Sequence, residues 1–161
     1  MGKCIYSSNS TINQISIRIA EYLNKKGIKT ATIKATHNFD EKTLMAGWSH
    51  RSAAYIAGLG TFGVNRMIIT PAGCAGRFGS IIISHEIEPD KRPEDEYCIH
   101  YKTGSCLICV ESCPVSALHT ESFDRFTCYE HLLKTAERFK DIGLCDVCGK
   151  CVVHCPFALK H

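Results

Sequence analysis

Cysteine spacing constrains this chain more than any other feature of its 161 residues. Seven of the eleven cysteines fall in two runs, and each run ends in a Cys-Pro pair. The runs read Cys106-x2-Cys109-x3-Cys113-Pro114 and Cys145-x2-Cys148-x2-Cys151-x3-Cys155-Pro156. This spacing is typical of ferredoxin-type [4Fe–4S] ligation, in which the last cysteine of each run reaches the other run's cluster. The chain is therefore predicted to fold around two such centres and to carry electrons.

The second run matches the ferredoxin pattern at every position, but the first run lacks its first ligand. Thr103 occupies that position, and Cys98 is the substitute that we expect. The intervening loop contains Gly104, so it is able to fold back toward the run. The spacing then assigns one cluster to four cysteines, with the last one crossing over from the second run: Cys98, Cys106, Cys109 and Cys155.

The other cluster has one candidate ligand too many. Cys148, Cys151 and the crossed Cys113 supply three ligands, and Cys145 completes the motif. Cys128 also stands between the runs, at the start of an amphipathic stretch, although a free cysteine is commonly a small buried apolar residue. Spacing alone therefore favours Cys145 over Cys128 as the fourth ligand.

Zinc binding and disulfide formation are the other chemistries that use paired cysteines. Structural zinc also uses C-x2-C pairs, but it has little use for a third cysteine, an x3 step or a Cys-Pro ending. No signal peptide is visible, so we expect a cytoplasmic chain in which such dense spacing binds metal instead of forming disulfides. No apolar run approaches the ~20 residues that span a bilayer, so no membrane association is expected.

The formal net charge of +3 is a poor guide to partners. Each oxidised cluster with four thiolates contributes about −2, so two clusters would make the loaded protein slightly negative. The basic balance is therefore no argument for a nucleic-acid partner.

A charged segment over residues 86–96 divides the chain, because it carries Pro89 and Pro93 and has almost nothing to bury. We expect an α/β part over residues 1–85 and a cluster module over residues 97–161, which together make an α+β chain.

Hydrophobic periodicity and turn residues predict the elements of both parts. Four apolar residues recur at helical spacing after Ser10 or Thr11 and before Gly27, and they predict a helix there: Ile12, Ile15, Ile19 and Leu23. The remaining predicted elements are strands over 29–35, 67–70 and 79–84 and helices over 49–58 and 128–140. Their order suggests a layered α/β arrangement in the first part.

The glycine-rich middle of the chain matches G-x-G-x-x-G at Gly58, Gly60 and Gly63. A dinucleotide fingerprint lies between a strand and a helix, whereas these glycines follow a helix and precede a strand. They are expected to serve turns and close packing, or the close approach of backbone to a large flat cofactor. His50 is interpreted first as a structural histidine, with acid–base chemistry as the alternative. Cys74 lies between Gly73 and Gly76, with no neighbour in the sequence that indicates a lowered thiol pKa.

The middle of the chain resembles the epoxyqueuosine reductase family, and reductive dehalogenases more distantly. The resemblance lies in the run from Trp48 to Asn65, WSHRSAAYIAGLGTFGVN, and then in Met67-Ile-Ile-Thr-Pro71 and Gly76-Arg-Phe-Gly-Ser80. With the two cysteine runs it extends over most of the chain. It implies a small nitroreductase-like α/β part that binds cobalamin, followed by a ferredoxin-like module with two [4Fe–4S] clusters.

The resemblance also implies roles for particular residues. In this family a lone cysteine on the helix between the runs is a cluster ligand, and it matches Cys128. The resemblance therefore favours Cys128 where spacing favours Cys145, and it places a second cluster on Cys113, Cys128, Cys148 and Cys151. A corrinoid pocket would be lined by residues of the glycine-rich middle: His50, Gly58, Gly60, Gly63 and Asn65.

In the family, electrons pass through the clusters to the corrinoid cobalt, which reduces a substrate, in the named members a modified tRNA nucleoside. Family members carry a substantial N-terminal portion that completes the pocket and supplies an acidic residue, and this sequence shows no counterpart. A redox partner protein or that portion is therefore expected to complete the site, and no sequence feature supports tRNA binding by itself.

Three functions follow from these patterns. The first is an iron–sulfur electron-transfer protein or domain that passes electrons through two clusters to a corrinoid or a partner. The second is a complete cobalamin-dependent reductase, an oxidoreductase whose catalytic residues the sequence does not assign. The third is a non-redox binding module in which metal only staples a small fold.

Overall fold

The computed structural model describes residues 2–35, 39–143 and 146–159. The helices within these ranges are α1 (Gly2–Lys25), α2 (His50–Ile56), α3 (Ile99–Thr103), α4 (Ile108–Glu111), α5 (Arg125–Arg138), a 3-10 turn (Lys140–Ile142) and α6 (Lys150–Val153). The strands are β1 (Thr30–Ile33), β2 (Thr61–Phe62), β3 (Ile68–Ile69) and β4 (Ser80–Ile83).

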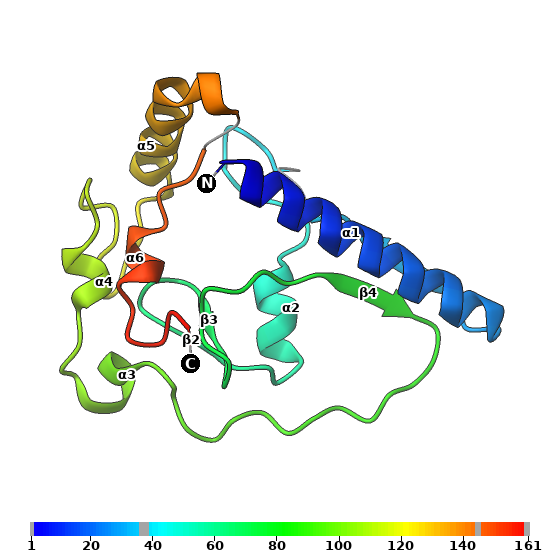
Figure 1. The fold of residues 1–161 in the computed structure, drawn as a ribbon. Coiled ribbons are helices and arrows are strands. Elements are labelled where there is room, and N and C mark those ends of the chain that lie inside the picture. The colour runs from blue at the N-terminus through cyan, green and yellow to red at the C-terminus, as the bar shows by residue number, and fades with distance from the viewer. Residues whose placement is uncertain (1, 36–38, 144–145, 160–161) are drawn as a thin grey trace.

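The strands form two separate antiparallel pairs. β1 pairs with β4, with Thr30 opposite Ile83, and β2 pairs with β3, with Thr61 opposite Ile69. The β1–β4 pair lies along the long helix α1 at one end of the molecule, while α3, α4, α5 and α6 lie at the other (Figure 1). The chain is thus a mixed helix-and-sheet protein, and the layered α/β arrangement predicted for the first part is replaced by these two small pairs.

Helix α1 is longer than the sequence predicts. It begins at Gly2, well before the predicted cap at Ser10, and it ends at Lys25. The predicted start is wrong because serine and asparagine, which are frequent before that point, are weak helix formers that carry no apolar periodicity. Gly27 closes the helix as expected, with a φ of +81° and a backbone N–H that donates to the carbonyl of Asn24.

α1 packs on β1 and β4 through a face of small and polar residues. Ser16 and Ala20 are buried on this face, and Asn13 Oδ1 accepts a hydrogen bond of 2.8 Å from the backbone N–H of Ala35. Ile15 and Ile19 are about half exposed. Ile12 and Leu23, the other two members of the predicted apolar stripe, are partly buried, so α1 buries only half of that stripe.

The β2–β3 hairpin forms the tightest part of the core. Ile68, Ile69 and Val64 are almost completely buried. Gly60 lies directly against the backbone carbonyl of Ile69, where a Cβ atom would collide with it. This close approach explains why the glycine-rich middle of the chain needs a glycine at position 60.

Helix α5 carries Cys128, one of the two candidates for the fourth ligand of the second cluster. Asp124 caps it, and its side chain accepts hydrogen bonds from the backbone N–H groups of Phe126 and Thr127. The helix therefore begins three residues before Cys128, the predicted start. Cys128 lies inside the first turns of the helix, with its N–H bonded to the carbonyl of Asp124.

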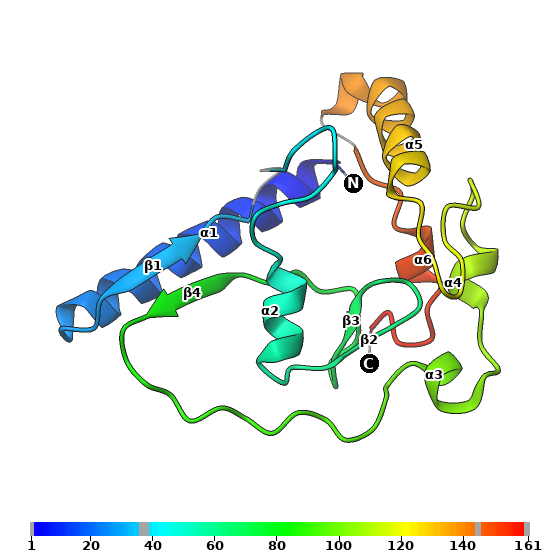
Figure 2. The same ribbon diagram turned by 180° about the vertical axis from the view of Figure 1, so that it is seen from behind.

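An extended segment connects β4 to α3 and runs along one edge of the molecule (Figure 2). It covers residues 84–98, which contain no helix or strand. Contacts connect the end of this segment, and the part of the chain that follows it, to the part that precedes it. The backbone N–H of Tyr97 donates to Thr61 Oγ1 at 2.9 Å, and the N–H of Cys74 donates to the carbonyl of Phe157 at 2.7 Å. The domain boundary at 86–96 stays a prediction.

None of the described helices is long and apolar enough to cross a lipid bilayer.

Candidate metal centres and the adjoining cleft

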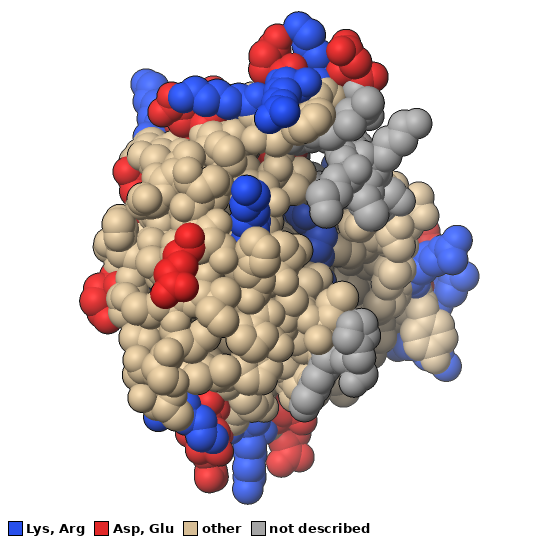
Figure 3. All heavy atoms as spheres, turned by 60° about the vertical axis from the view of Figure 1, so that its left-hand side comes forward, with Lys and Arg blue, Asp and Glu red and all other residues tan. Residues whose placement is uncertain are grey.

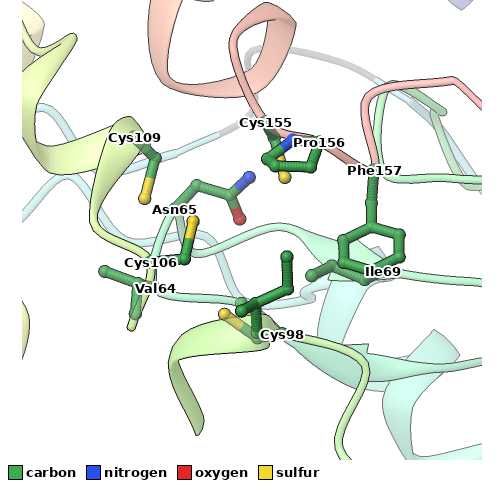
Figure 4. Close-up of a pocket in the computed structure, with 11 residues that line it drawn as sticks. Val64, Asn65, Ile69, Cys98, Cys106, Cys109, Cys155, Pro156 and Phe157 are labelled. Carbon is green, nitrogen blue, oxygen red and sulfur yellow. The ribbon is translucent and has the colours of Figure 1, made fainter. Parts of the chain in front are cut away.

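Four cysteines from separate segments line one cavity, and they are the four that the sequence groups together. Cys98 caps α3, Cys106 precedes α4, Cys109 lies in α4 and Cys155 follows α6. Their sulfur atoms lie around the same space in Figure 4. The cavity has an empty volume of about 330 Å³, including space that opens to solvent. We call these residues the first cysteine set.

The rest of this cavity is mostly apolar. Val64 and Ile69 of the glycine-rich middle and Phe157 near the C-terminal end line it, together with the amide side chain of Asn65. Apolar walls exclude water and lower the local dielectric, which strengthens the mutual repulsion of thiolates.

The electrostatics of the first set confirm that its members are close to one another. Burial first, and then the negative charges of Cys155, Cys98 and Cys106, raise the pKa of Cys109 to about 11. Thiolates that repel one another in this way are stable together only when a cationic centre lies among them. The donor set therefore fits an iron–sulfur cluster.

A second group of four cysteines lies close together. Burial raises the pKa of Cys128, and the charges of Cys151, Cys113 and Cys148 raise it further, in that order. The pKa of Cys151 is likewise raised by burial and then by Cys148 and Cys113. Cys113, Cys128, Cys148 and Cys151 therefore lie together, and we call them the second cysteine set. Cys145, the rival that spacing favours, lies outside the described residues.

Cys113 receives backbone hydrogen bonds that suit a ligand. Burial acts to raise its pKa, but backbone N–H groups of residues 115–118 outweigh burial and lower it. The N–H of Ala117 lies 3.3 Å from Cys113 Sγ. N–H groups directed at a sulfur stabilise its negative charge.

The two sets share one apolar core and one polar bridge. Val64, Cys109 and Leu118 form a buried cluster, against which cysteines of both sets pack. Asn65 is 6% exposed and lines the first cavity, and its Nδ2 also donates to the backbone carbonyl of Cys151 at 3.4 Å. The two sets are therefore neighbours within one folded unit.

The geometry does not suit a single metal ion. Within the part of the chain that the structure describes, no three His, Cys, Asp or Glu side chains converge tightly enough to bind one ion. A cubane cluster holds its thiolates at four different irons, so its ligands stand further apart than those of one zinc ion.

The structure also brings Cys74 to the first set, which sequence reasoning missed. Cys74 is 1% exposed, and its thiol lies beside that of Cys155. Interaction with Cys155 and burial raise the pKa of Cys74, while interaction with Cys74 lowers the pKa of Cys155 to about 6. The flanking glycines were the available signal, because Gly73 approaches the backbone of Phe157 and Ala158 closely.

A large cleft adjoins the second set. Its empty volume is about 1970 Å³, including space open to solvent. Three regions supply most of its lining: Ala35 and residues within 39–52, which include the start of α2, residues 75–78, and residues within 147–153. Cys148 of the second set is one of the lining residues. A ligand in this cleft would therefore lie beside the second cysteine set.

Of the five residues expected to line a corrinoid pocket, the structure brings only His50 to this cleft. Gly63 and Asn65 line the first cavity instead. Gly58 faces the backbone of the extended segment at Asp90 and Lys91, and Gly60 lies against Ile69. The sequence pattern could not separate these places, because a tight hairpin turns successive glycines toward different neighbours.

His50 is held by protein partners on both ring nitrogens. Nδ1 lies 2.8 Å from Ser80 Oγ, and Nε2 lies 3.3 Å from the carbonyl of Lys34. A carbonyl only accepts, so Nε2 carries the proton and Nδ1 accepts from Ser80. Trp48 Nε1 also donates to Ser80 Oγ at 3.1 Å. This network agrees with the structural interpretation of His50 and fixes one wall of the cleft.

Two arginines give the cleft a positive character. Arg51 and Arg77 both line it, and Arg51 donates to the carbonyl of Arg66 at 2.7 Å. An opening lined by guanidinium groups attracts an anionic ligand.

The face over α3 and α4 has few charged side chains. Lys, Arg, Asp and Glu gather toward the two ends of this view, and few lie between them (Figure 3). Tyr101 of α3 and Ile108 of α4 are each 42% exposed. Ile108 directly precedes Cys109, so exposed apolar surface lies close to the first set.

Comparisons with known proteins give a consistent result. No protein-family model matches the chain. Over 71 residues, or 44% of this chain, it is 41% identical to the epoxyqueuosine reductase of Staphylococcus aureus, and this match covers 17% of that protein.

Solved structures of epoxyqueuosine reductase share the fold. A selenomethionine-labelled epoxyqueuosine reductase superposes with a TM-score of 0.68 and 23% identity, covering 95% of this chain and 40% of that one. The enzyme from Streptococcus thermophilus gives a TM-score of 0.66 and 21% identity, covering 92% of this chain and 39% of that one. The chain thus spans about 40% of the length of these structures. It is related to epoxyqueuosine reductase, in sequence over part of its length and in fold over nearly all of it.

Proposed function

We propose that this chain transfers electrons through two [4Fe–4S] clusters. The first cysteine set would hold one cluster and the second cysteine set the other. The observation that carries this proposal is the crossing of the two runs. Cys155 of the second run lies in the first set, and Cys113 of the first run lies in the second set. Such crossing is the signature of a two-cluster ferredoxin arrangement.

When bound, the clusters supply reversible one-electron chemistry. The chain's own residues would determine the direction of electron transfer and would shield the clusters from water. The apolar core of Val64, Cys109 and Leu118 lies against both sets and keeps water from the space between them. The N–H groups around Cys113 stabilise negative charge on the second set.

The position of Cys148 supports an exit for electrons into the cleft. It belongs to the second set and lines the cleft, so the second cluster would stand next to a ligand bound there. The weakly charged face beside the first set would receive a redox partner protein, since protein interfaces have cores depleted of charge. Electrons would then enter at the first set and leave at the second.

Anaerobic purification tests the proposal. We expect about eight iron and about eight sulfide per chain, with EPR signals of reduced [4Fe–4S] clusters. A colourless, zinc-loaded protein that cannot be reconstituted with iron and sulfide would refute it. A loaded protein that cannot be cycled reversibly in a redox titration would indicate the third function, a metal-stapled module.

The identity of the fourth ligand of the second cluster can be tested directly. We propose Cys128, because its thiol interacts with those of Cys113, Cys148 and Cys151. Cys128→Ala is expected to lose about half of the iron, and Cys145→Ala to retain all of it. Iron loss in Cys145→Ala alone would transfer the assignment to Cys145.

A cobalamin-dependent reductase is the second candidate, and the cleft favours it. The cleft is large, carries arginines and borders the second set, so it is suited to a bulky cofactor that takes up electrons. Incubation with cobalamin and gel filtration under anaerobic conditions should leave a bound chromophore whose cobalt is reduced through the clusters. Complete loss of corrinoid on the column would leave electron transfer to a partner as the function. Substrate reduction like that of epoxyqueuosine reductase belongs to this second candidate.

A further inference from the structure

We propose that the side-chain amide of Asn65 sets the spacing between the two clusters by capping the short helix α6. The inference rests on the proposed function, since it takes Cys151 as a ligand of the second cluster and Cys155 as a ligand of the first. Asn65 is then a positioning residue that binds no iron itself.

Helix α6 connects the two cysteine sets within one short stretch of chain. Cys151 of the second set lies inside the helix, and Cys155 of the first set directly follows its C-terminal cap, His154. The helix has only four residues, so it depends on contacts outside itself for its position. A movement of α6 would therefore displace one ligand of each cluster at once.

The C-terminal turn of α6 leaves the carbonyl of Cys151 to a side chain. The N–H of Cys155, which would close a regular helical bond to that carbonyl, donates instead to the carbonyl of Val152 at 3.1 Å. Asn65 Nδ2 donates to the carbonyl of Cys151 at 3.4 Å. Carbonyls in the last turn of a helix need partners from outside the helix, so Asn65 acts as a C-terminal cap of α6.

A tight turn between β2 and β3 fixes the direction of the Asn65 amide. Its Oδ1 accepts from the backbone N–H of Met67 at 3.1 Å, so its Nδ2 is left to point away from that bond. The N–H of Gly63 donates to the carbonyl of Met67 at 2.9 Å and closes the turn. A Cβ atom at Gly63 would stand 2.9 Å from Asn65 Oδ1, so the glycine leaves the space that the amide occupies.

The base of this turn is the most buried part of the molecule. Val64 and Ile69 are each 1% exposed, and Val64 belongs to the apolar cluster against which both cysteine sets pack. Asn65 itself is buried and lies among the cysteines of the first set in Figure 4. The amide therefore extends from a firmly packed hairpin to a helix of one turn, and it transfers the position of the hairpin to that helix.

Loss of the donor has a defined consequence. The carbonyl of Cys151 would lack its partner, and a shift of α6 toward another donor would relieve that cost. The magnetic dipole interaction between two reduced clusters falls with the cube of their separation. A small shift of α6 should therefore change the splitting in the EPR spectrum of the fully reduced protein, while each cluster keeps its own four ligands.

EPR of the loaded, fully reduced protein tests the inference. We expect Asn65→Leu, which has a similar volume and no donor, to keep its full iron content and to show a changed splitting. Asn65→Asp in alkaline buffer keeps an oxygen for the N–H of Met67 and lacks only the donor, so its splitting should change as well. Asn13→Leu is the matched control, because Asn13 on α1 also bonds a backbone group, the N–H of Ala35, and belongs to neither cysteine set. Its splitting should equal that of the wild type.

Three results would overturn the inference. Wild-type splitting in both Asn65 variants with full iron content would show that the amide does not set the spacing. An equal change in Asn13→Leu would indicate a general loosening of the fold. Loss of iron from both Asn65 variants would make Asn65 a requirement for assembly of the cysteine sets, not for their spacing. The proposed function fails separately, because it requires about eight iron and two reducible clusters in the wild-type protein, whatever the Asn65 variants show.

Discussion

Replacing Gly73 with alanine should dislodge the segment that follows Cys155. Gly73 has a φ of +112°, which L side chains rarely adopt. An added Cβ would stand 2.8 Å from the carbonyl oxygen of Ala158 and 3.0 Å from that of Phe157. Both neighbours are backbone atoms that cannot rotate away. The substitution must therefore strain the loop or separate it from the segment.

The contacts at risk set the size of the effect. The strained conformation costs about 1–3 kcal/mol for a residue with a side chain. Separation also breaks the hydrogen bonds from Cys74 and Ala75 to Phe157 and Ala158, each worth about 0.5–1.5 kcal/mol. We expect Gly73→Ala to lower the free energy of unfolding by about 2–6 kcal/mol. For a chain of this length that corresponds to a fall in Tm on the order of 10 °C.

Gly76→Ala is the matched control, because it lies in the same loop and no heavy atom is within 4 Å of the added Cβ. Its unfolding free energy should stay within about 0.5 kcal/mol of wild type. Anaerobic thermal unfolding, followed by the visible absorbance of the clusters and by circular dichroism, compares the two variants. Equal melting curves for Gly73→Ala and Gly76→Ala would refute the close backbone approach on which the reasoning depends.

Two further predictions concern the core and the helix cap. Leu118→Ala should cost about 2–5 kcal/mol of unfolding free energy in denaturant titrations, because Leu118 is 3% exposed in the cluster that both cysteine sets contact. Leu133→Ala, at a residue 49% exposed, should change it by less than about 0.5 kcal/mol, and equal losses would contradict this core. Asp124→Ala should lower Tm at neutral pH, since Thr127 and Phe126 hold the pKa of Asp124 below its usual range by hydrogen bonding. The stabilisation by ionised Asp124 is present above the ordinary aspartate pKa of about 3.9 and is lost as pH falls through the lower folded-state pKa. The difference in Tm between Asp124→Ala and wild type should therefore shrink in acid. A difference that grows on acidification would contradict the cap.

The sequence predicted the membership of the first set because cysteine spacing records ligand chemistry directly. Cys98 was the hardest of the four to predict, since it lies outside the cysteine motif of the first run. The structure places it in the cavity with Cys106, Cys109 and Cys155. Whether the four bind a cluster stays a prediction for the iron analysis.

The second set is where spacing and the family resemblance favour different residues. Local spacing favours Cys145, which lies outside the described residues, whereas Cys128 comes from a helix that is separate in sequence and near Cys113, Cys148 and Cys151 in space. Sequence periodicity locates Cys128 on a helix without stating what that helix faces. Only the family resemblance pointed to Cys128.

The glycine-rich middle was the least predictable region. Its expected helix and its strand over 67–70 appear as α2 and β3, with Ser49 capping α2 as predicted, whereas β2 was not predicted. The roles of its residues depend on contacts with distant segments, however. Asn65, which was expected at a corrinoid pocket, contacts Cys74 and Cys151 in the structure. No local pattern predicts contacts between residues so far apart.

The contacts that shape the first cavity have a consequence for the order of folding. The hydrogen bond between Asn65 and Cys151 joins residues 86 positions apart. Closing so long a loop costs conformational entropy before its contacts repay the loss, and folding slows as contact separation grows. Helices α1 and α5, which depend on local bonds, are free to form early. The first cavity must be among the last parts to assemble. Cluster binding would therefore follow the collapse of the chain and would indicate that folding is complete.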